Sequence, residues 1–220
     1  NLNDNIFFLV LTTLIFTILL AFCVIVFGAY VRLTDAGLGC PDWPGCYGFI
    51  TVPDTAEELS AIEESFPGQV VEPGKAWREM IHRYIASLLG LLILILFVSE
   101  AFKKNKTVFS DNFNLKISLL LLLLVIFQGL LGMWTVTLKV HPFVVLAHLV
   151  GGLSTLSLLF VYLKRIGAPT KPRANFTGLL FFGFVLLIAQ ILLGGWTSTN
   201  YAALGCPDLP LCYGQFWPSN

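Results

Sequence analysis

The chain has 220 residues, of which 56% are hydrophobic and 12% are charged, and its mean hydropathy is +0.82. Soluble domains carry about 25% charged residues, so this composition excludes a soluble enzyme, a disordered chain and a nucleic-acid-binding protein with a basic surface. The 13 basic and 13 acidic residues cancel in number but are segregated along the chain. The chain begins with Asn1 and no charged leader precedes the first apolar run, so we expect it to be trimmed or incomplete at its start.

Apolar gaps between the charge clusters predict an all-α membrane protein with five transmembrane helices, since about 20 apolar residues cross a bilayer core. The predicted spans are 6–29, 77–99, 117–138, 142–163 and an apolar run at about 176–196. The second charge-free gap, 84–99, is short for a span, so we expect its helix to begin near Trp77 and to include residues 79–83. We expect residues 30–76 to form an external loop whose acidic part, 54–72, is solvated.

Basic residues in the loops orient the spans by the positive-inside rule. The loops after the second and fourth spans are basic: Lys103, Lys104, Lys106, Lys116, Lys164, Arg165, Lys171 and Arg173. The segment from Arg32 to Arg83 instead holds four basic and nine acidic residues. We therefore expect the N-terminus inside, and the long loop and the C-terminal segment outside.

Cysteine placement agrees with this orientation, because four of the five cysteines lie in the predicted external segments. Disulfides persist in an oxidising compartment, so we predict the pairs Cys40–Cys46 and Cys206–Cys212; the alternative is four free thiols. The Cys-x5-Cys spacing without a nearby His is poor for zinc. Cys23 lies in the middle of the first span and is predicted to be a small apolar packing residue.

An internal repeat divides the chain. Residues 38–48 recur as 204–214, with nine of eleven positions identical at an offset of 166. The fifth span is then the counterpart of the first, so 1–166 is the first four-helix unit, and 167–220 is the first helix and cysteine segment of a second unit. Because four is even, the duplication is parallel. We expect the chain to be a fragment of a protein with eight helices.

Two histidines lie inside predicted spans, where an ionisable group is a functional hypothesis by default. His82 is 18 residues from Glu100 and His148 is 16 from Lys164. At about 1.5 Å per residue, these depths are roughly 27 and 24 Å. Two imidazoles at one level of a four-helix unit are placed to ligate a metal or a haem iron from opposite sides. The alternative is two histidines satisfied by hydrogen bonds between helices.

Other residues near this level have simpler interpretations. His141 precedes Pro142 and is predicted to cap a helix or lie in a loop at the outer surface. Gln128 and Gln190 either face a cofactor or form hydrogen bonds across helices. Gly151, beside Gly152, allows a flat macrocycle or another helix to come close.

These motifs, in this order, resemble the haem A synthase family of cytochrome oxidase assembly proteins. The resemblance covers the whole chain and rests on residues 28–44, the Glu-x-x-His-Arg element at 79–83, and residues 130–136, 141–149 and 194–204. It implies an eight-helix protein with two similar halves, in the bacterial cytoplasmic membrane or the mitochondrial inner membrane.

The resemblance also implies an activity, the oxidation of the C8 methyl of haem O to the formyl of haem A. It assigns His82 and His148 as axial ligands of the haem iron in the first half, which takes haem O. Glu79 becomes the catalytic carboxylate, as a proton acceptor or as a partner of a cationic intermediate. Cys40–Cys46 becomes the external disulfide.

The family pattern places a haem B cofactor in the second half. Its ligands are expected near positions 248 and 314, beyond Asn220, so we expect one haem site here and incomplete catalysis. The expected partners are haem O synthase, an unidentified electron donor or acceptor, membrane lipid and a second copy of the protein, and no nucleic acid.

Two other classes compete with this interpretation. A quinone-linked membrane thiol-disulfide oxidoreductase explains the cysteines, but it does not explain two histidines at one depth in the membrane. The Cys-x-x-Cys motif that is usual in such enzymes is also absent. A haem B electron carrier explains the histidines without an oxidation step. Pigment extraction from the purified protein separates these classes.

Overall fold

A computed structural model describes residues 2–102, 112–166 and 178–216, except 203, 207, 209 and 210. Its helices are α1 (Leu2–Leu33), α2 (Ala56–Ser65), α3 (Pro73–Ala101), α4 (Asn112–Thr137), α5 (Pro142–Ile166) and α6 (Gly178–Thr199). All except the short α2 are long and apolar enough to cross a membrane. The described part of the chain therefore confirms the all-α fold class with five spans.

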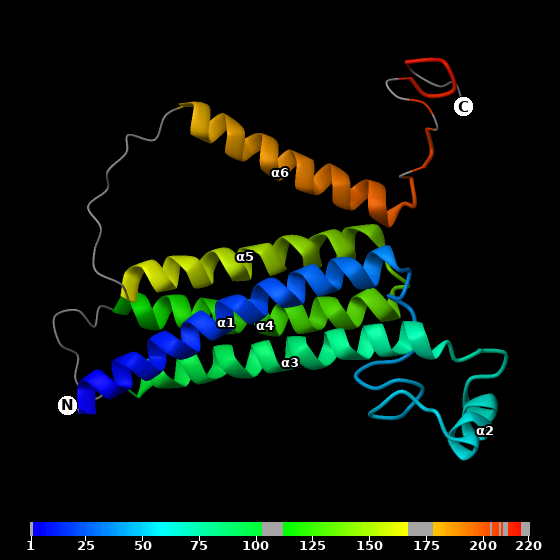
Figure 1. The fold of residues 1–220 in the computed structure, drawn as a ribbon, viewed down its shortest axis with the longest axis horizontal. Coiled ribbons are helices and arrows are strands. Elements are labelled where there is room, and N and C mark those ends of the chain that lie inside the picture. The colour runs from blue at the N-terminus through cyan, green and yellow to red at the C-terminus, as the bar shows by residue number, and fades with distance from the viewer. Residues whose placement is uncertain are drawn as a thin grey trace.

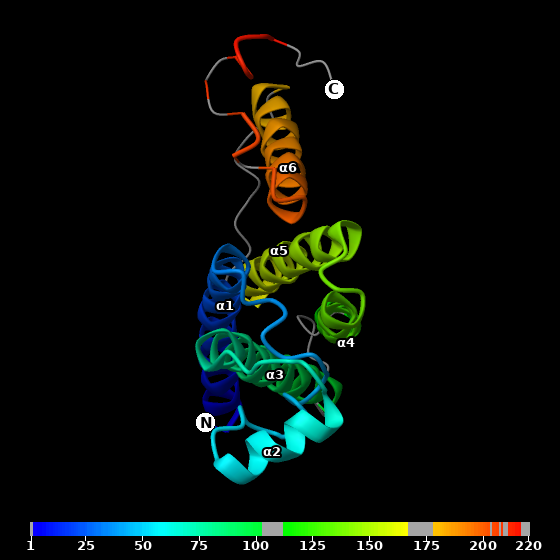
Figure 2. The same cartoon turned by 90° about the vertical axis from the view of Figure 1, so that its right-hand side faces the viewer.

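Helices α1, α3, α4 and α5 form a four-helix bundle (Figures 1 and 2). Around the bundle, α1 packs on α3, α3 on α4, α4 on α5, and α5 on α1. Within the described residues, the backbones of α3 and α5 do not approach each other, so these two helices are diagonal neighbours across the centre. Helix α6 lies outside this ring and packs against α5.

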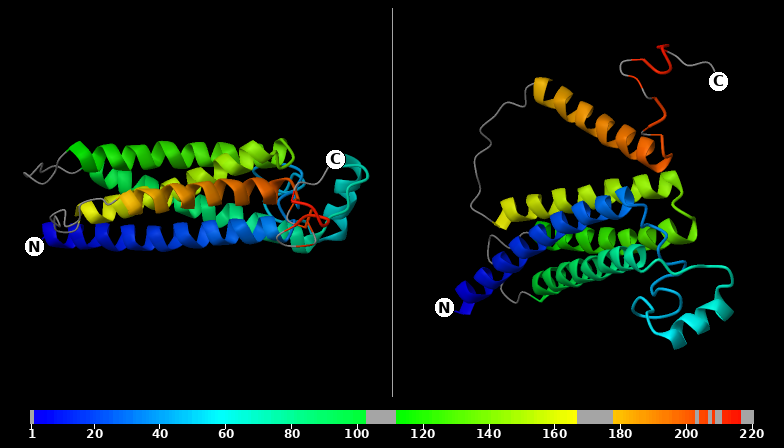
Figure 3. Two further views of the ribbon diagram at one scale, coloured as in Figure 1. Left: turned by 90° about the horizontal axis from the view of Figure 1, so that it is seen from above. Right: turned by 45° about the vertical axis from the view of Figure 1, so that its right-hand side comes forward.

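The bundle has one end that carries both cysteine segments, as Figures 1 and 3 show. Helices α1 and α4 end there, at Leu33 and Thr137, while α3 and α5 begin there, at Pro73 and Pro142. We call this the disulfide end. Residues on α1 and α6 therefore approach it with increasing number, whereas residues on α3 and α5 approach it with decreasing number.

The interior of the bundle is a cluster of apolar side chains from all four helices. Its fully or nearly fully buried members include Leu14, Ile93, Leu96, Leu121 and Leu159. The lipid-facing surface is equally apolar, so packing between helices rather than hydropathy alone distinguishes the two faces. Cys23 is exposed on this outer surface, so its predicted packing role is wrong.

The acidic part of the expected external loop, 54–72, contains the helix α2 where a solvated loop was expected, and the loop 30–76 has a small core of its own. Thr55 and Glu58 form a capping box at the start of α2, in which the Thr55 side chain accepts a hydrogen bond from the Glu58 N–H and the Glu58 carboxylate accepts from the Thr55 N–H. These hydrogen bonds hold the pKa of the Glu58 carboxyl below its usual value. Ile62 of α2 belongs to the same buried cluster as Tyr47.

Replacing Leu14, which has no exposed surface, should leave a cavity in the bundle. We expect Leu14→Ala to lower the free energy of unfolding by about 2 kcal/mol, the low end of the range for such changes, because lipid is as apolar as the core and mainly packing is lost. The control is Leu19→Ala at a side chain that is 59% exposed. Thermal unfolding of the purified protein in detergent measures both, and equal losses would contradict the assigned core.

Candidate functional site

The two histidines of the predicted pair come from the diagonal helices. His82 lies on α3 and His148 on α5. Both rings are partly buried, and among the described residues the fully buried Nδ1 atom of each has no hydrogen-bond partner. The structure therefore places both imidazoles in the interior, near the disulfide end. His148 also interacts with the backbone of Gln128 on α4, so the simpler interpretation is met in part at that residue.

The neighbouring helices leave room for the His82 ring. A Cβ atom at Gly28 of α1 would lie 2.9 Å from His82 Cε1, so a larger residue there would displace the imidazole. The Phe27 ring lies nearly parallel to the imidazole, with centroids 6.4 Å apart. On the other side of the bundle, His148 lies beside Gly132 of α4. Both imidazoles are thus held between helices rather than directed toward lipid.

Gln128 of α4 is a third polar side chain in this region. It is buried, and its Nε2 atom has no hydrogen-bond partner. A Cβ atom at Gly151 would collide with that Nε2, so the close approach expected at Gly151 is made by the Gln128 side chain. Leaving a buried polar atom unpaired costs about 1–3 kcal/mol. Three such nitrogen atoms in one apolar interior fit a site that is completed by a polar or metal-bearing ligand.

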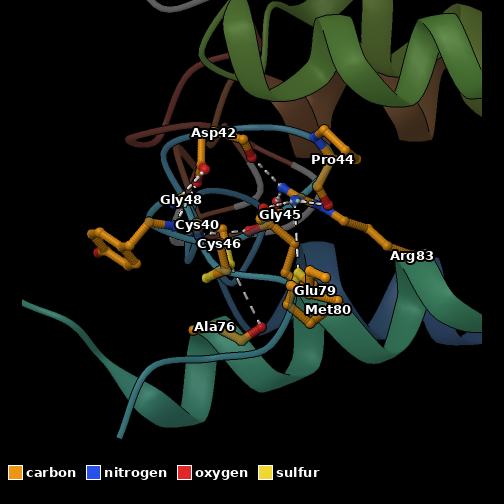
Figure 4. Close-up of a disulfide and its surroundings, with 12 residues drawn as sticks. Cys40, Asp42, Pro44, Gly45, Cys46, Gly48, Ala76, Glu79, Met80 and Arg83 are labelled. Carbon is orange, nitrogen blue, oxygen red and sulfur yellow. Dashed lines mark hydrogen bonds and ion pairs between the residues drawn. A yellow bond between two sulfur atoms is a disulfide. The ribbon is translucent and has the colours of Figure 1, made fainter. Parts of the chain in front are cut away.

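The first disulfide loop covers this end of the bundle (Figure 4). Cys40 and Cys46 are bonded, with an S–S distance of 2.04 Å, and neither residue has exposed surface. The Asp42 carboxylate accepts hydrogen bonds from the N–H groups of Tyr47 at 2.6 Å and Gly48 at 2.7 Å. Burial raises the pKa of the Tyr47 phenol, and the nearby carboxylates add to this effect. The loop is a closed, internally hydrogen-bonded unit.

The second cysteine segment repeats this construction. Cys206 and Cys212 are bonded, with an S–S distance of 2.12 Å. The Asp208 carboxylate accepts from the N–H groups of Tyr213 and Gly214, both at 2.8 Å, and these two bonds lower the pKa of Asp208. The internal repeat in the sequence therefore corresponds to one loop structure formed twice.

Arg83 and Glu79 fasten the first loop to α3. Arg83 donates to the carbonyl oxygens of Asp42 at 3.0 Å and Pro44 at 3.1 Å, and also to that of Gly45. It forms an ion pair with Glu79 at 2.5 Å, and the other Glu79 oxygen accepts from the Cys40 N–H at 3.0 Å (Figure 4). Both Glu79 oxygens are thus engaged, on the helical turn that also carries His82.

The contacts of Arg83 and Glu79 with the first loop, which we call the Arg83 clamp, were not predicted from the sequence. The spacing of Glu79 and Arg83 signals an ion pair along one helix, but nothing in it identifies loop carbonyls about forty residues away as partners.

Two other polar candidates lie apart from the histidine pair. His141 is exposed at the disulfide end and stacks with Phe143, and Gln190 is exposed on α6. The described residues contain no cluster of three or more metal-ligating side chains.

Removing the Arg83 clamp should open the first loop. We expect Arg83→Gln to speed reduction of Cys40–Cys46 by dithiothreitol about tenfold, because charge-assisted hydrogen bonds are worth about 1.5–3 kcal/mol. Mass spectrometry of alkylated peptides measures the rate. The Cys206–Cys212 bond in the same molecule is the control and should react at its original rate. Unchanged reduction of Cys40–Cys46 would show that the clamp does not protect the loop.

Comparison with known proteins gives the family. The sequence profile of the cytochrome oxidase assembly protein family matches residues 12–220. A haem A synthase from Shewanella oneidensis is 52% identical over 94% of this chain, and one from Halalkalibacterium halodurans is 30% identical over 87%. The chain spans 61% and 60% of those relatives, respectively. No solved structure matches it. The chain belongs to the family of cytochrome oxidase assembly proteins, which are integral to the membrane.

Proposed function

We propose that the protein of this chain is a haem A synthase, which oxidises the C8 methyl of haem O to the formyl of haem A for cytochrome oxidase assembly. The observation that carries the proposal is the pair formed by His82 and His148 on diagonal helices, with unpartnered Nδ1 atoms in an apolar interior. The names of the relatives support it. The chain spans about three fifths of those relatives, so the activity is assigned to the whole protein.

His82 and His148 hold the haem O substrate through its iron. Bound there, the iron porphyrin supplies the redox chemistry that no side chain can supply. Gln128 adds an amide nitrogen that has no partner within the described part of the protein. The apolar surface of the bundle suits an isoprenoid tail, which partitions into lipid rather than water. Clamped by Arg83, the first disulfide loop limits access of water at the disulfide end.

Glu79 is the proposed catalytic carboxylate. It lies one helical turn from His82 and is only 5% exposed. Its ion pair with Arg83 and its bond from the Cys40 N–H fix the carboxylate in place, so it can hold a proton or face a developing positive charge without rearranging. The same contacts also align the first loop with the turn of α3 that carries His82.

The remaining assignments follow the same proposal. A resident haem B belongs to the second half of the protein, haem O synthase supplies the substrate, and an electron donor or acceptor and a second copy of the protein are further partners. The two relatives come from bacteria, which supports the bacterial cytoplasmic membrane. The basic loops support an N-terminus inside and the disulfide end outside.

A thiol-disulfide oxidoreductase fits the structure less well. Such enzymes need a cysteine that is at least partly accessible to the partner thiol. Cys40 and Cys46 are instead fully buried beneath their own loop. Burial of this disulfide therefore supports the haem proposal over the oxidoreductase alternative.

Replacing His82 should stop the reaction and leave its substrate. In cells that depend on the full-length protein, we expect His82→Ala to abolish haem A and accumulate haem O, measured by chromatography of extracted haems. His141→Ala is the matched control, because that imidazole is exposed and lies outside the pair. Normal haem A with His82→Ala, or a purified wild-type protein without a Soret band, would overturn the proposed function.

Glu79→Gln tests the carboxylate separately. The amide is nearly isosteric but carries no charge, so we expect the haem to remain bound while haem A formation falls about 100-fold, the low end for loss of a general acid or base. Absorbance of the purified protein and chromatography of its haems measure the two effects. Haem A formed at the normal rate would remove Glu79 from the reaction.

A further inference from the structure

The face of α3 that carries His82 also carries the cationic side chain of Arg78. Its residues recur at every third or fourth position, a spacing that keeps one face of a helix toward a bundle core: Arg78, His82, Ile85, Leu89, Ile93, Leu96 and Glu100. Leu89, Ile93 and Leu96 are buried in that core. Arg78 therefore belongs to the same stripe as His82, one turn closer to the disulfide end. Glu79 and Arg83 face the loop instead.

Arg78 has no partner that accounts for this position. Its Nε atom is fully buried without a hydrogen bond, and no ion pair joins it to another described residue. The carboxylate of Glu79, the next residue on α3, is already held by Arg83 and the Cys40 N–H. A buried, unpaired guanidinium nitrogen is costly, because desolvation is not offset.

A second arginine lies at the same level on the neighbouring helix. Arg32 of α1 is one turn closer to the disulfide end than Gly28, the residue against which the His82 ring rests. Its Nη atoms donate to the Ser198 carbonyl at 2.6 Å and the Tyr201 hydroxyl at 3.1 Å, and Nη1 also forms an ion pair with Asp35 at 3.7 Å. Arg32 is therefore held by Asp35 and by the end of α6, whereas Arg78 has no ion pair among the described residues.

We propose that Arg78 binds a propionate carboxylate of the haem, an inference that rests on the proposed function. A guanidinium recognises a carboxylate with paired, charge-assisted hydrogen bonds. The C8 methyl is next to a propionate-bearing position on the ring. Fixing the carboxylate edge at the disulfide end therefore also fixes the methyl that is oxidised.

The test compares two probes that differ only in their carboxylates. The purified full-length protein in detergent, with the expected haem B of its second half already bound, is titrated with ferric protoporphyrin IX and with its dimethyl ester, and the added Soret absorbance reports binding at the first half. We expect Arg78→Gln to weaken binding of the free acid about tenfold and to leave binding of the ester unchanged. Arg78→Lys should recover part of the loss, because it restores charge but not the paired geometry.

Lys75→Gln is the matched control. It removes one positive charge from the same end of α3, where Lys75 is paired with Glu72 at 3.2 Å, and both probes should bind as before. Equal weakening of acid and ester by Arg78→Gln would overturn the proposal and give Arg78 a structural role, and so would unchanged binding of both. A wild-type protein that binds neither probe would refute the haem function itself.

Discussion

The account depends on one constraint, that polar nitrogen atoms buried in an apolar helical bundle must find partners. Two histidines, a glutamine and two arginines place such atoms near one end of the bundle, and none of these atoms has a partner in the described part of the protein. The proposed haem would offer its iron to the imidazoles and a carboxylate to Arg78, two groups carried on one molecule. The surrounding apolar cluster then serves to exclude water and fix the helices.

The first disulfide loop and the histidine site are connected through one short segment of α3. Glu79, His82 and Arg83 lie within a single turn and a half of α3, and two of the three hold the loop while the third faces the interior. Movement of the loop therefore acts on the helix that carries His82, a proposed haem ligand. The second cysteine segment has the same internal structure, which extends the sequence repeat to the level of hydrogen bonds.

Several of these features can be predicted from the sequence, for reasons that differ from one feature to another. The five spans and the common depth of His82 and His148 follow from local apolar runs and the fixed helical rise. The diagonal placement of α3 and α5 does not, because spacing along a chain says nothing of helix order around a bundle. The capping box at Thr55 was a readable signal for α2. The loop partners of Arg83 were not, because they depend on the folded loop.

The central claim is that His82 and His148 would together hold one haem iron. The most direct measurement is the electron paramagnetic resonance spectrum of the purified protein loaded with ferric protoporphyrin IX, compared with that of the His82→Ala protein, because the haem B expected in the second half contributes a signal of its own. The account predicts a low-spin signal that is present in the wild-type protein and lost with His82→Ala. A low-spin spectrum that His82→Ala leaves unchanged would contradict it.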